Sequence, residues 1–171
     1  MANFGVDSDG SIEGYGAYFG NVDSHSDSID RGAFADTIAK AKRTGRMPAL
    51  LLQHAMGSQI EDSLPLGTWA DMTEDGSGLY VKGRLALGNR RADDVHALIR
   101  AGALNGLSIG FVAKRFTMLP KGGDVRRRLH AIDLREISVV HYPSNDLARI
   151  HSVKAEGDLR ALSNLAASLR S

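Results

Sequence analysis

Residues 104–114 read LNGLSIGFVAK, the stretch that most constrains the fold. In a strand, successive side chains point to opposite faces. One face then carries Leu107, Ile109 and Phe111, which suit a core, and the other carries Gly106, Ser108 and Gly110. The letters also match the G-x-S-x-G pattern of α/β-hydrolases, but that pattern needs a strand–turn–helix context, and here apolar residues continue the strand. We therefore predict a strand with one hydroxyl between two positions that lack side chains.

Other segments with a strand pattern lie on both sides of this one. They are IEGYGAYF at 12–19, ALLLQ at 49–53, LGTWADMTE at 66–74, LYVKGRLAL at 79–87, and 126–141. The third and fourth flank an Asp-Gly-containing turn at 75–78, which predicts a hairpin. Residues 21–28, NVDSHSDS, are expected to form a polar loop.

Apolar residues at helical spacing predict three helices. The first follows Asp30 or Gly32 as its cap and ends near Gly45, the second covers residues 90–101 and stops at Gly102, and the third covers 155–170. The expected fold is α+β, a β-rich single domain at 1–154 with a mostly antiparallel sheet or barrel surrounded by helices. Residues 155–171 are expected to be a C-terminal amphipathic helix or tail.

The composition narrows the function classes. The 171 residues carry a net charge of +1, which gives no electrostatic case for a nucleic-acid partner. There is no cysteine, so thiol catalysis and cysteine-bound zinc are excluded. No apolar run approaches the roughly 20 residues that span a bilayer, and no signal peptide is evident, so we expect a protein that is cytosolic where it is made and has no membrane partner.

Ser108 has two interpretations. The bare positions beside it could let an extended peptide approach within about 3 Å of the hydroxyl, or they could only avoid a clash with a neighbouring strand. A serine needs a base to become a nucleophile. His54 is the best placed of the six histidines, because it ends an apolar strand that can aim it. The alternative for His54 is a surface or structural histidine.

The stretch DLREISVVHYP at 133–143 offers a third member, which would orient the His54 ring. Glu136 stands among apolar strand residues, where an unpaired carboxylate is rare. It could instead be an edge-strand glutamate paired with an arginine. His141 and Asp133 compete for the same role.

The chain resembles the prohead (capsid maturation) serine proteases of tailed bacteriophages, which are similar to the herpesvirus assemblins. The matching stretches are GYGAYFGNVDSHSDSIDRGAFADTI, LLLQHAMGSQIEDSLPLGTW, DGSGLYVKGRL, RAGALNGLSIGF and LREISVVHYPSNDLA, in this order between about residues 12 and 153. One departure is Ala55, where family members often carry an acidic residue.

The resemblance implies a serine endopeptidase that needs no cofactor, with Ser108 as nucleophile, His54 as general base and acid, and Glu136 as the acidic member. In the assemblins that third role belongs to a second histidine. It implies as substrates the scaffold segment of the major capsid protein, or a separate scaffolding protein, and the protease itself. Lys154-Ala155-Glu156 is a candidate self-processing site. The resemblance places the enzyme in the host bacterial cytoplasm, inside the assembling procapsid, and is compatible with a homo-oligomer.

Two other readings of the sequence stay open. A catalytically silent capsid- or scaffold-binding module could keep the same fold. Its binding surface would be the apolar face of the predicted helix at 155–170, which carries Leu159, Leu162, Ala166 and Leu169. A metal hydrolase could use His25, Asp27 and His54, although their spacing matches no ligand motif. For the oxyanion donors of a protease, the backbone near Gly122 and Gly123, or near 126–128, is a candidate.

Overall fold

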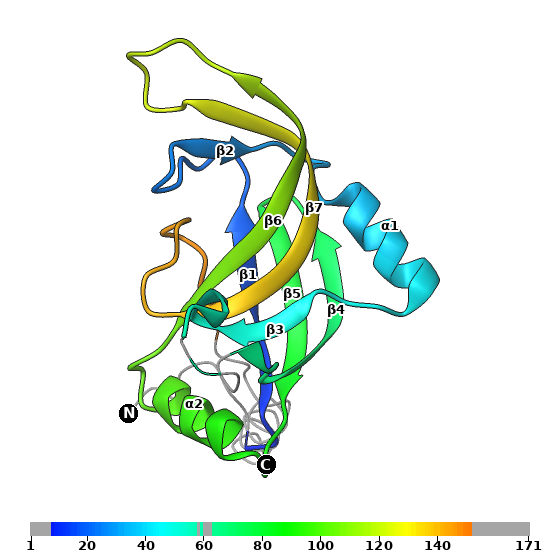
Figure 1. Cartoon of the computed structure of the whole chain (residues 1–171), viewed down its shortest axis with the longest axis vertical. Coiled ribbons are helices and arrows are strands. Elements are labelled where there is room, and N and C mark those ends of the chain that lie inside the picture. Colours follow the sequence, from blue (N-terminus) through cyan, green and yellow to red (C-terminus); the bar gives the residue numbers. More distant parts are fainter. Residues whose placement is uncertain (1–7, 58, 60–62, 152–171) are drawn as a thin grey trace, which may run out of the picture.

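One curved sheet with two helices against it makes up the described part of the chain, residues 8–57, 59 and 63–151 of a computed structural model (Figure 1). The elements in order are β1 (Ser11–Tyr18), β2 (Asp27–Ile29), α1 (Ala35–Thr44), β3 (Ala49–Leu52), the short turn η1 (Gln53–Ala55), β4 (Gly67–Glu74), β5 (Gly78–Leu85), α2 (Arg90–Arg100), β6 (Gly106–Met118), β7 (Arg127–Val140) and β8 (Ile150–His151). The predicted α+β class is confirmed. The predicted terminal helix, the boundary at residue 154 and the candidate self-processing site lie outside the described residues.

Among the described strands, β7 pairs with the largest number of others, namely β2, β3 and β6. The order is β2-β7-β3-β4-β5-β1-β8, and β6 pairs with β7 along its other edge. The pairs β2–β7 and β3–β7 are parallel, and the others are antiparallel, so the mostly antiparallel sheet is confirmed. The two ends of the sheet approach each other at one isolated bridge, Gly106–Arg149, so the sheet is strongly curved but the alternative of a closed barrel is wrong.

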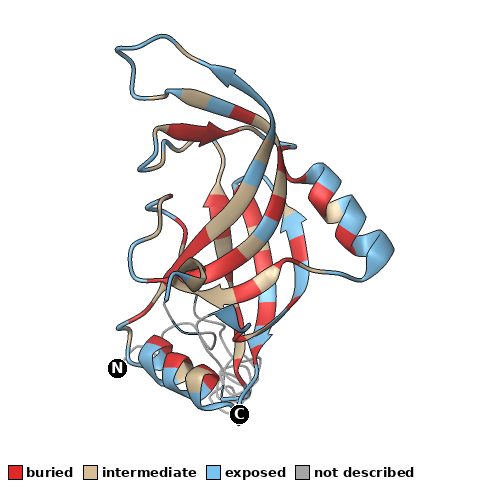
Figure 2. Cartoon of the chain, viewed as in Figure 1, coloured by how far each residue is buried: buried red, intermediate tan, exposed pale blue. Residues whose placement is uncertain are grey.

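The concave side of the sheet holds the core. Leu79, Val81, Leu107, Ile137 and Val139 are fully buried there, and Figure 2 shows the buried positions recurring along the central strands. The alternation predicted for 104–114 agrees with this, because Leu107 is in the core and Ile109 and Phe111 pack against it. Burial of this apolar surface is the main favourable term in folding.

The helices and the hairpin were predicted well, but the N-terminal cap of α1 was not. Gly45 ends α1 in the left-handed conformation (φ 68°), and its N–H donates to the Ala41 carbonyl at 2.8 Å. Phe34 precedes the helix without a side-chain cap, so the prediction of Asp30 or Gly32 as the cap is wrong. The Asp30 carboxylate instead accepts from Arg128 Nε at 2.7 Å. No helix among the described residues is long and apolar enough to cross a membrane.

The stretch predicted as a polar loop, residues 21–28, overlaps the buried strand β2 (Asp27–Ile29). Its first residue, Asp27, is only 4% exposed and forms a two-pronged ion pair with Arg127 of β7, with Arg127 Nε donating to Oδ1 at 2.8 Å and Arg127 Nη2 donating to Oδ2. The charge of a buried carboxylate is tolerated only when it is paired in this way. A strand partner 100 residues away therefore converts a polar segment into part of the sheet.

Candidate active site

Two serines and a carboxylate share one face of the β6–β7 pair. Ser108 stands directly opposite Ser138, and Gly110 stands directly opposite Glu136. Residues opposite each other in antiparallel strands place their Cβ atoms about 5 Å apart on the same face. Ser108, Ser138 and Glu136 are therefore neighbours, and the strand predicted around Ser108 is present.

The glycines beside Ser108 make room for residues of β7. A Cβ added to Gly110 would lie 2.1 Å from Glu136 Oε1, and one added to Gly106 would lie 2.6 Å from the Val140 carbonyl oxygen. Both distances are far inside van der Waals contact. Of the two interpretations of the bare positions, avoidance of a clash with a neighbouring strand is the one that the geometry supports.

His54 leaves the sheet in an unusual turn. The strand β3 runs parallel to β7 with Leu52 beside Val139, so the chain leaves β3 close to Ser138. Gln53, His54 and Ala55 then all adopt left-handed backbone angles, with φ of 50°, 57° and 54°. For non-glycine residues this conformation costs roughly 1–2 kcal/mol each. Such strain persists where surrounding contacts hold it, and it concentrates at functional sites.

The turn aims the His54 ring at Glu136. His54 Nδ1 lies 2.6 Å from Glu136 Oε1, and the two side chains are 31% and 12% exposed. The hydrogen bond to the Glu136 carboxylate raises the pKa of His54 above its usual value, and partial burial opposes this only in part. With Nδ1–H donating to the carboxylate, the lone pair of the neutral ring is on Nε2, the nitrogen that can accept a proton.

Ser138 holds this pair in place and was not singled out from the sequence. Its Oγ donates to Glu136 Oε2 at 2.5 Å and accepts from the backbone N–H of His54 at 3.2 Å. Both carboxylate oxygens of Glu136 are thus engaged. The available signal was a serine two residues after the glutamate, because residues at that spacing share a face of a strand.

Ser108 lies beside this pair without being bonded to it. Residues of β6 have Cα atoms within 8 Å of those of the turn that carries His54. Ser108 itself is 4% exposed. Within the residues that the structure describes, no hydrogen bond joins the Ser108 hydroxyl to His54. Catalytic hydrogen bonds are often long in a protein without substrate, so this geometry fits a relay that tightens on binding.

His141 and Asp133, the other candidates for the residue that orients His54, have other hydrogen-bond partners. His141 Nδ1 is hydrogen bonded to Gln53 Nε2, one residue before His54. The Asp133 carboxylate accepts from Arg135 Nη2 at 2.7 Å. Neither is bonded to the His54 ring, so Glu136 is the candidate that the structure brings together with His54.

The residues of the alternative metal site do not gather in one place. The Asp27 carboxylate is occupied by Arg127, whereas His54 is paired with Glu136 on β7. Among residues 8–57, 59 and 63–151, no group of three or more histidine, aspartate and glutamate side chains is arranged to hold a metal ion.

The glycine turn proposed for the oxyanion donors is too far away. Gly122 and Gly123 form the tip of the β6–β7 hairpin, and the nearest paired residues are Met118 and Arg127 (Figure 1). Met118 is ten residues from Ser108 along β6, about 30 Å of strand at about 3.3 Å per residue. The tip at Gly122 and Gly123 is therefore remote from Ser108 along β6, whereas Arg127 lines the same pocket as Ser108, so the backbone near 126–128 stays a prediction for the oxyanion donors.

A partly buried carboxylate that orients a histidine beside a strand serine is the arrangement used by serine hydrolases. Comparison with known proteins gives the family. The chain belongs to the caudovirus prohead serine proteases, since the model of that family matches residues 3–161. The resemblance inferred from the sequence is thereby confirmed.

One relative and one solved structure illustrate the match. The prohead protease of Enterobacteria phage HK97 is 38% identical over 148 residues, which are 85% of this chain and 61% of that protein. The chain thus spans less than two thirds of the length of this relative. The solved structure of the bacteriophage T4 capsid assembly protease has a TM-score of 0.61 at 17% identity, over 76% of this chain and 80% of that chain. At that identity the likeness shows a shared fold.

Proposed function

We propose that this chain is a serine endopeptidase of phage procapsid maturation, with Ser108 as nucleophile, His54 as general base and acid, and Glu136 as the residue that orients His54. The observation that carries the proposal is the 2.6 Å contact between His54 Nδ1 and Glu136 Oε1, next to a serine on the adjoining strand. Membership of the prohead protease family supports the same chemistry.

The proposed reaction has two halves. His54 Nε2 takes the proton of the Ser108 hydroxyl as Oγ attacks the scissile carbonyl carbon, and the protonated ring is stabilised by the Glu136 carboxylate. The ring then returns the proton to the leaving amine, which leaves an acyl-enzyme on Ser108. In the second half His54 takes a proton from water, the resulting hydroxide releases the acyl group, and the proton returns to Ser108.

The proposed substrates and setting follow from the family. They are the scaffold segment of the major capsid protein or a separate scaffolding protein, and the chain itself in autocleavage. The proposed place of action is the assembling procapsid in the host bacterial cytoplasm, and the proposed working form is a homo-oligomer. The kinship of the fold with the herpesvirus assemblins belongs to the same proposal, with Glu136 in the position that a second histidine holds there.

Fluorophosphonate labelling tests the proposal directly. The purified protein should take up one label, which peptide mapping should locate on Ser108, and Ser108→Ala should abolish both the label and cleavage of a scaffold-bearing capsid precursor. An activity loss of about 10⁴-fold or more is expected when a catalytic serine is removed. An unlabelled, inactive wild-type protein that still binds scaffold would instead identify the catalytically silent binding module.

A further inference from the structure

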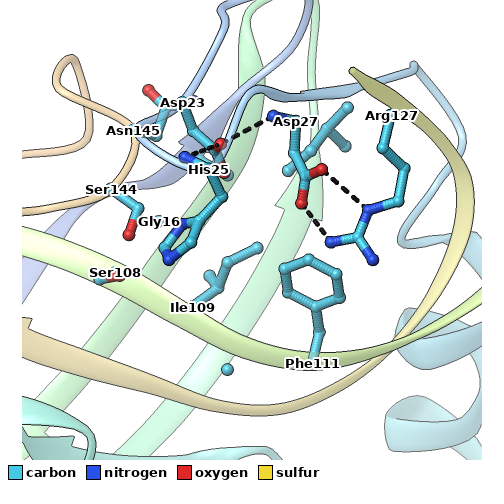
Figure 3. Close-up of a pocket in the computed structure, with 13 residues that line it drawn as sticks. Gly16, Asp23, His25, Asp27, Ser108, Ile109, Phe111, Arg127, Ser144 and Asn145 are labelled. Atoms are coloured by element: carbon cyan, nitrogen blue, oxygen red, sulfur yellow. Dashed lines mark hydrogen bonds and ion pairs between the residues drawn. The ribbon is translucent and has the colours of Figure 1, made fainter. Parts of the chain in front are cut away.

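A pocket of about 280 Å³ lies beside Ser108 (Figure 3). Its lining includes Ser108, Ile109 and Phe111 of β6 and Ile29 of β2, with the Asp27–Arg127 ion pair at the end next to Phe111. Neither His54 nor Glu136 lines it. Ser108 is therefore the residue common to the pocket and to the neighbourhood of the His54–Glu136 pair.

The pocket follows an open edge of the sheet. On the edge of β6 away from β7, the last backbone hydrogen bond is that from Leu107 N to the Ala148 carbonyl at 3.1 Å. From Ser108 to Met118 that edge has no strand partner among the described residues. An extended peptide can pair with such an edge, and its side chains then enter adjoining pockets.

The carboxylates of Asp23 and Asp27 and the guanidinium of Arg127, which line the pocket, are already engaged within the protein. Both oxygens of Asp27 accept from Arg127. Asp23 Oδ1 accepts from the backbone N–H groups of His25 and Asp27 at 2.8 and 2.9 Å, as Figure 3 shows. A charged side chain that entered the pocket would lose water and would find neither the Asp27 carboxylate nor the Arg127 guanidinium free, which is costly. The apolar part of the lining is formed by Ile29, Ile109 and Phe111, and His25, Ser144 and Asn145 add polar side chains.

We infer that this pocket is a specificity pocket that selects an apolar side chain, of leucine or phenylalanine type, near the scissile bond of the peptide substrate. The inference rests on the proposed function, because it assigns a role to the pocket relative to cleavage at Ser108. The distance from Ser108 to Phe111 is three residues of strand, about 10 Å, so the selected side chain lies within about three residues of the cleaved bond.

A peptide library tests the selection. Peptides of a scaffold-derived sequence that the protein cleaves are made with each position around the bond replaced in turn by Leu, Phe, Ser, Lys and Glu, and kcat/KM is measured for each. One position within three residues of the bond should favour Leu or Phe over Lys and Glu by at least about tenfold. Equal rates at every such position, or a preference for a charged residue, would overturn the inference.

Variants of the ion pair connect the selection to this pocket. Arg127→Met leaves the Asp27 carboxylate unpaired, so the Lys/Leu rate ratio at the selected position should rise about tenfold or more. Asp27→Asn leaves the Arg127 guanidinium unpaired and should raise the Glu/Leu ratio instead. Lys114→Met is the matched control, since it removes one positive charge from the same hairpin at an exposed side chain outside the pocket. Unchanged ratios in both pocket variants would contradict the assignment.

A variant that changes the size of the pocket tests the same inference if the variants that break the ion pair do not fold. Phe111→Trp narrows the pocket and should shift the preference from Phe toward Leu, whereas Val112→Ala, at a 46% exposed neighbour, should not. An unshifted preference in Phe111→Trp would contradict the inference.

Binding separates this inference from the proposed function. The same Leu, Lys and Glu peptides, carrying a fluorophore, are titrated against Ser108→Ala and followed by anisotropy. If the wild type cleaves none of the peptides but Ser108→Ala prefers the Leu peptide, the protease proposal fails and the pocket assignment stands. If the wild type cleaves without an apolar preference, the pocket assignment fails and the protease proposal stands.

Discussion

The carboxylate of Glu136 occupies the space that a side chain at Gly110 would need. A Cβ at position 110 would lie 2.1 Å from Glu136 Oε1, the oxygen that contacts His54. Gly110, two residues after Ser108 on β6, thus allows the Glu136 side chain to extend over β6 toward His54. The composition of β6 and the orientation of His54 are coupled through this single contact.

Gly110→Ala tests that coupling. We expect the methyl group to push Glu136 away from His54, with a fall in kcat/KM of about 100-fold and a loss of about 1–3 kcal/mol in the free energy of unfolding, the usual cost of overpacking. Gly123→Ala is the matched control on the same hairpin, because an added Cβ there meets nothing within 4 Å. Cleavage assays and urea titrations measure both effects. Wild-type turnover in Gly110→Ala would show that Glu136 does not need this position.

Glu136→Gln should move the pH profile of the proposed protease toward acid. The carboxylate raises the pKa of His54, and the ring must be neutral to accept the Ser108 proton, so wild-type kcat/KM should rise with pH through an apparent pKa above 6.5. Without the carboxylate charge the pKa of His54 falls, so kcat/KM of the variant should rise at lower pH. Its maximal kcat/KM should be reduced by about 10²–10⁴-fold. An unshifted rise would mean that Glu136 does not act on His54.

The raised pKa of His54 also predicts how the free energy of unfolding depends on pH. A histidine with a raised pKa in the folded protein stabilises the fold fully below its unfolded pKa of about 6.5, and this contribution is lost as the pH rises through the folded value. The difference in unfolding free energy between wild type and Glu136→Gln should therefore shrink from pH 6 to pH 9. Urea titrations over that range check this, and a difference that grew with pH would contradict it.

Ser138→Ala should distinguish the two serines that face each other. Ser138 is fully buried and its hydroxyl is committed to Glu136, so it is expected to position the carboxylate and not to react. Removing a hydrogen bond to a charged group costs about 1.5–3 kcal/mol, and we expect a fall in kcat of about 10–100-fold. Fluorophosphonate should still label Ser138→Ala on Ser108. A label that disappears in Ser138→Ala and persists in Ser108→Ala would reverse the two roles.

Ala55→Gly tests the strain in the turn that carries His54. At φ 54° glycine relieves a steric cost of about 1–2 kcal/mol, which offsets its greater freedom in the unfolded chain, so the stability should stay equal or rise by up to about 1 kcal/mol. Ala39→Gly, at an exposed position inside α1, should lower the stability by about 1 kcal/mol. Thermal unfolding of both variants checks this. A larger loss in Ala55→Gly than in Ala39→Gly would mean that the turn is not strained.

Local patterns were sufficient to predict most of the sheet. The alternation at 104–114, the Asp-Gly turn at 75–78 and the helix stop at Gly45 each depend on neighbours in sequence, and all three are present. The strand β2 could not be predicted in this way. Asp27 is a residue type that favours loops. Its place in a strand depends on its ion pair with Arg127, 100 residues later in the sequence.

The site shows the same division between local and distant causes. His54 was predicted at the end of an apolar strand, and that position follows from the run at 49–53. The left-handed turn of three non-glycine residues has no local signature, because the contacts that hold it, such as the bonds from His54 to Ser138 and Glu136, come from β7. Glu136, His141 and Asp133 could not be ranked from sequence, since only the parallel pairing of β3 with β7 decides which of them meets the histidine.

The central position of β7 also governs when this site can exist during synthesis. His54 and Glu136 are 82 residues apart, and β7 must pair with both β3 and β6 before the imidazole has its carboxylate. At about 5–20 residues per second, a ribosome needs roughly 4–16 s to translate that interval. Under the proposed assignment, a nascent chain has no carboxylate for His54 until Glu136 has been synthesised, so the pair cannot act before that point.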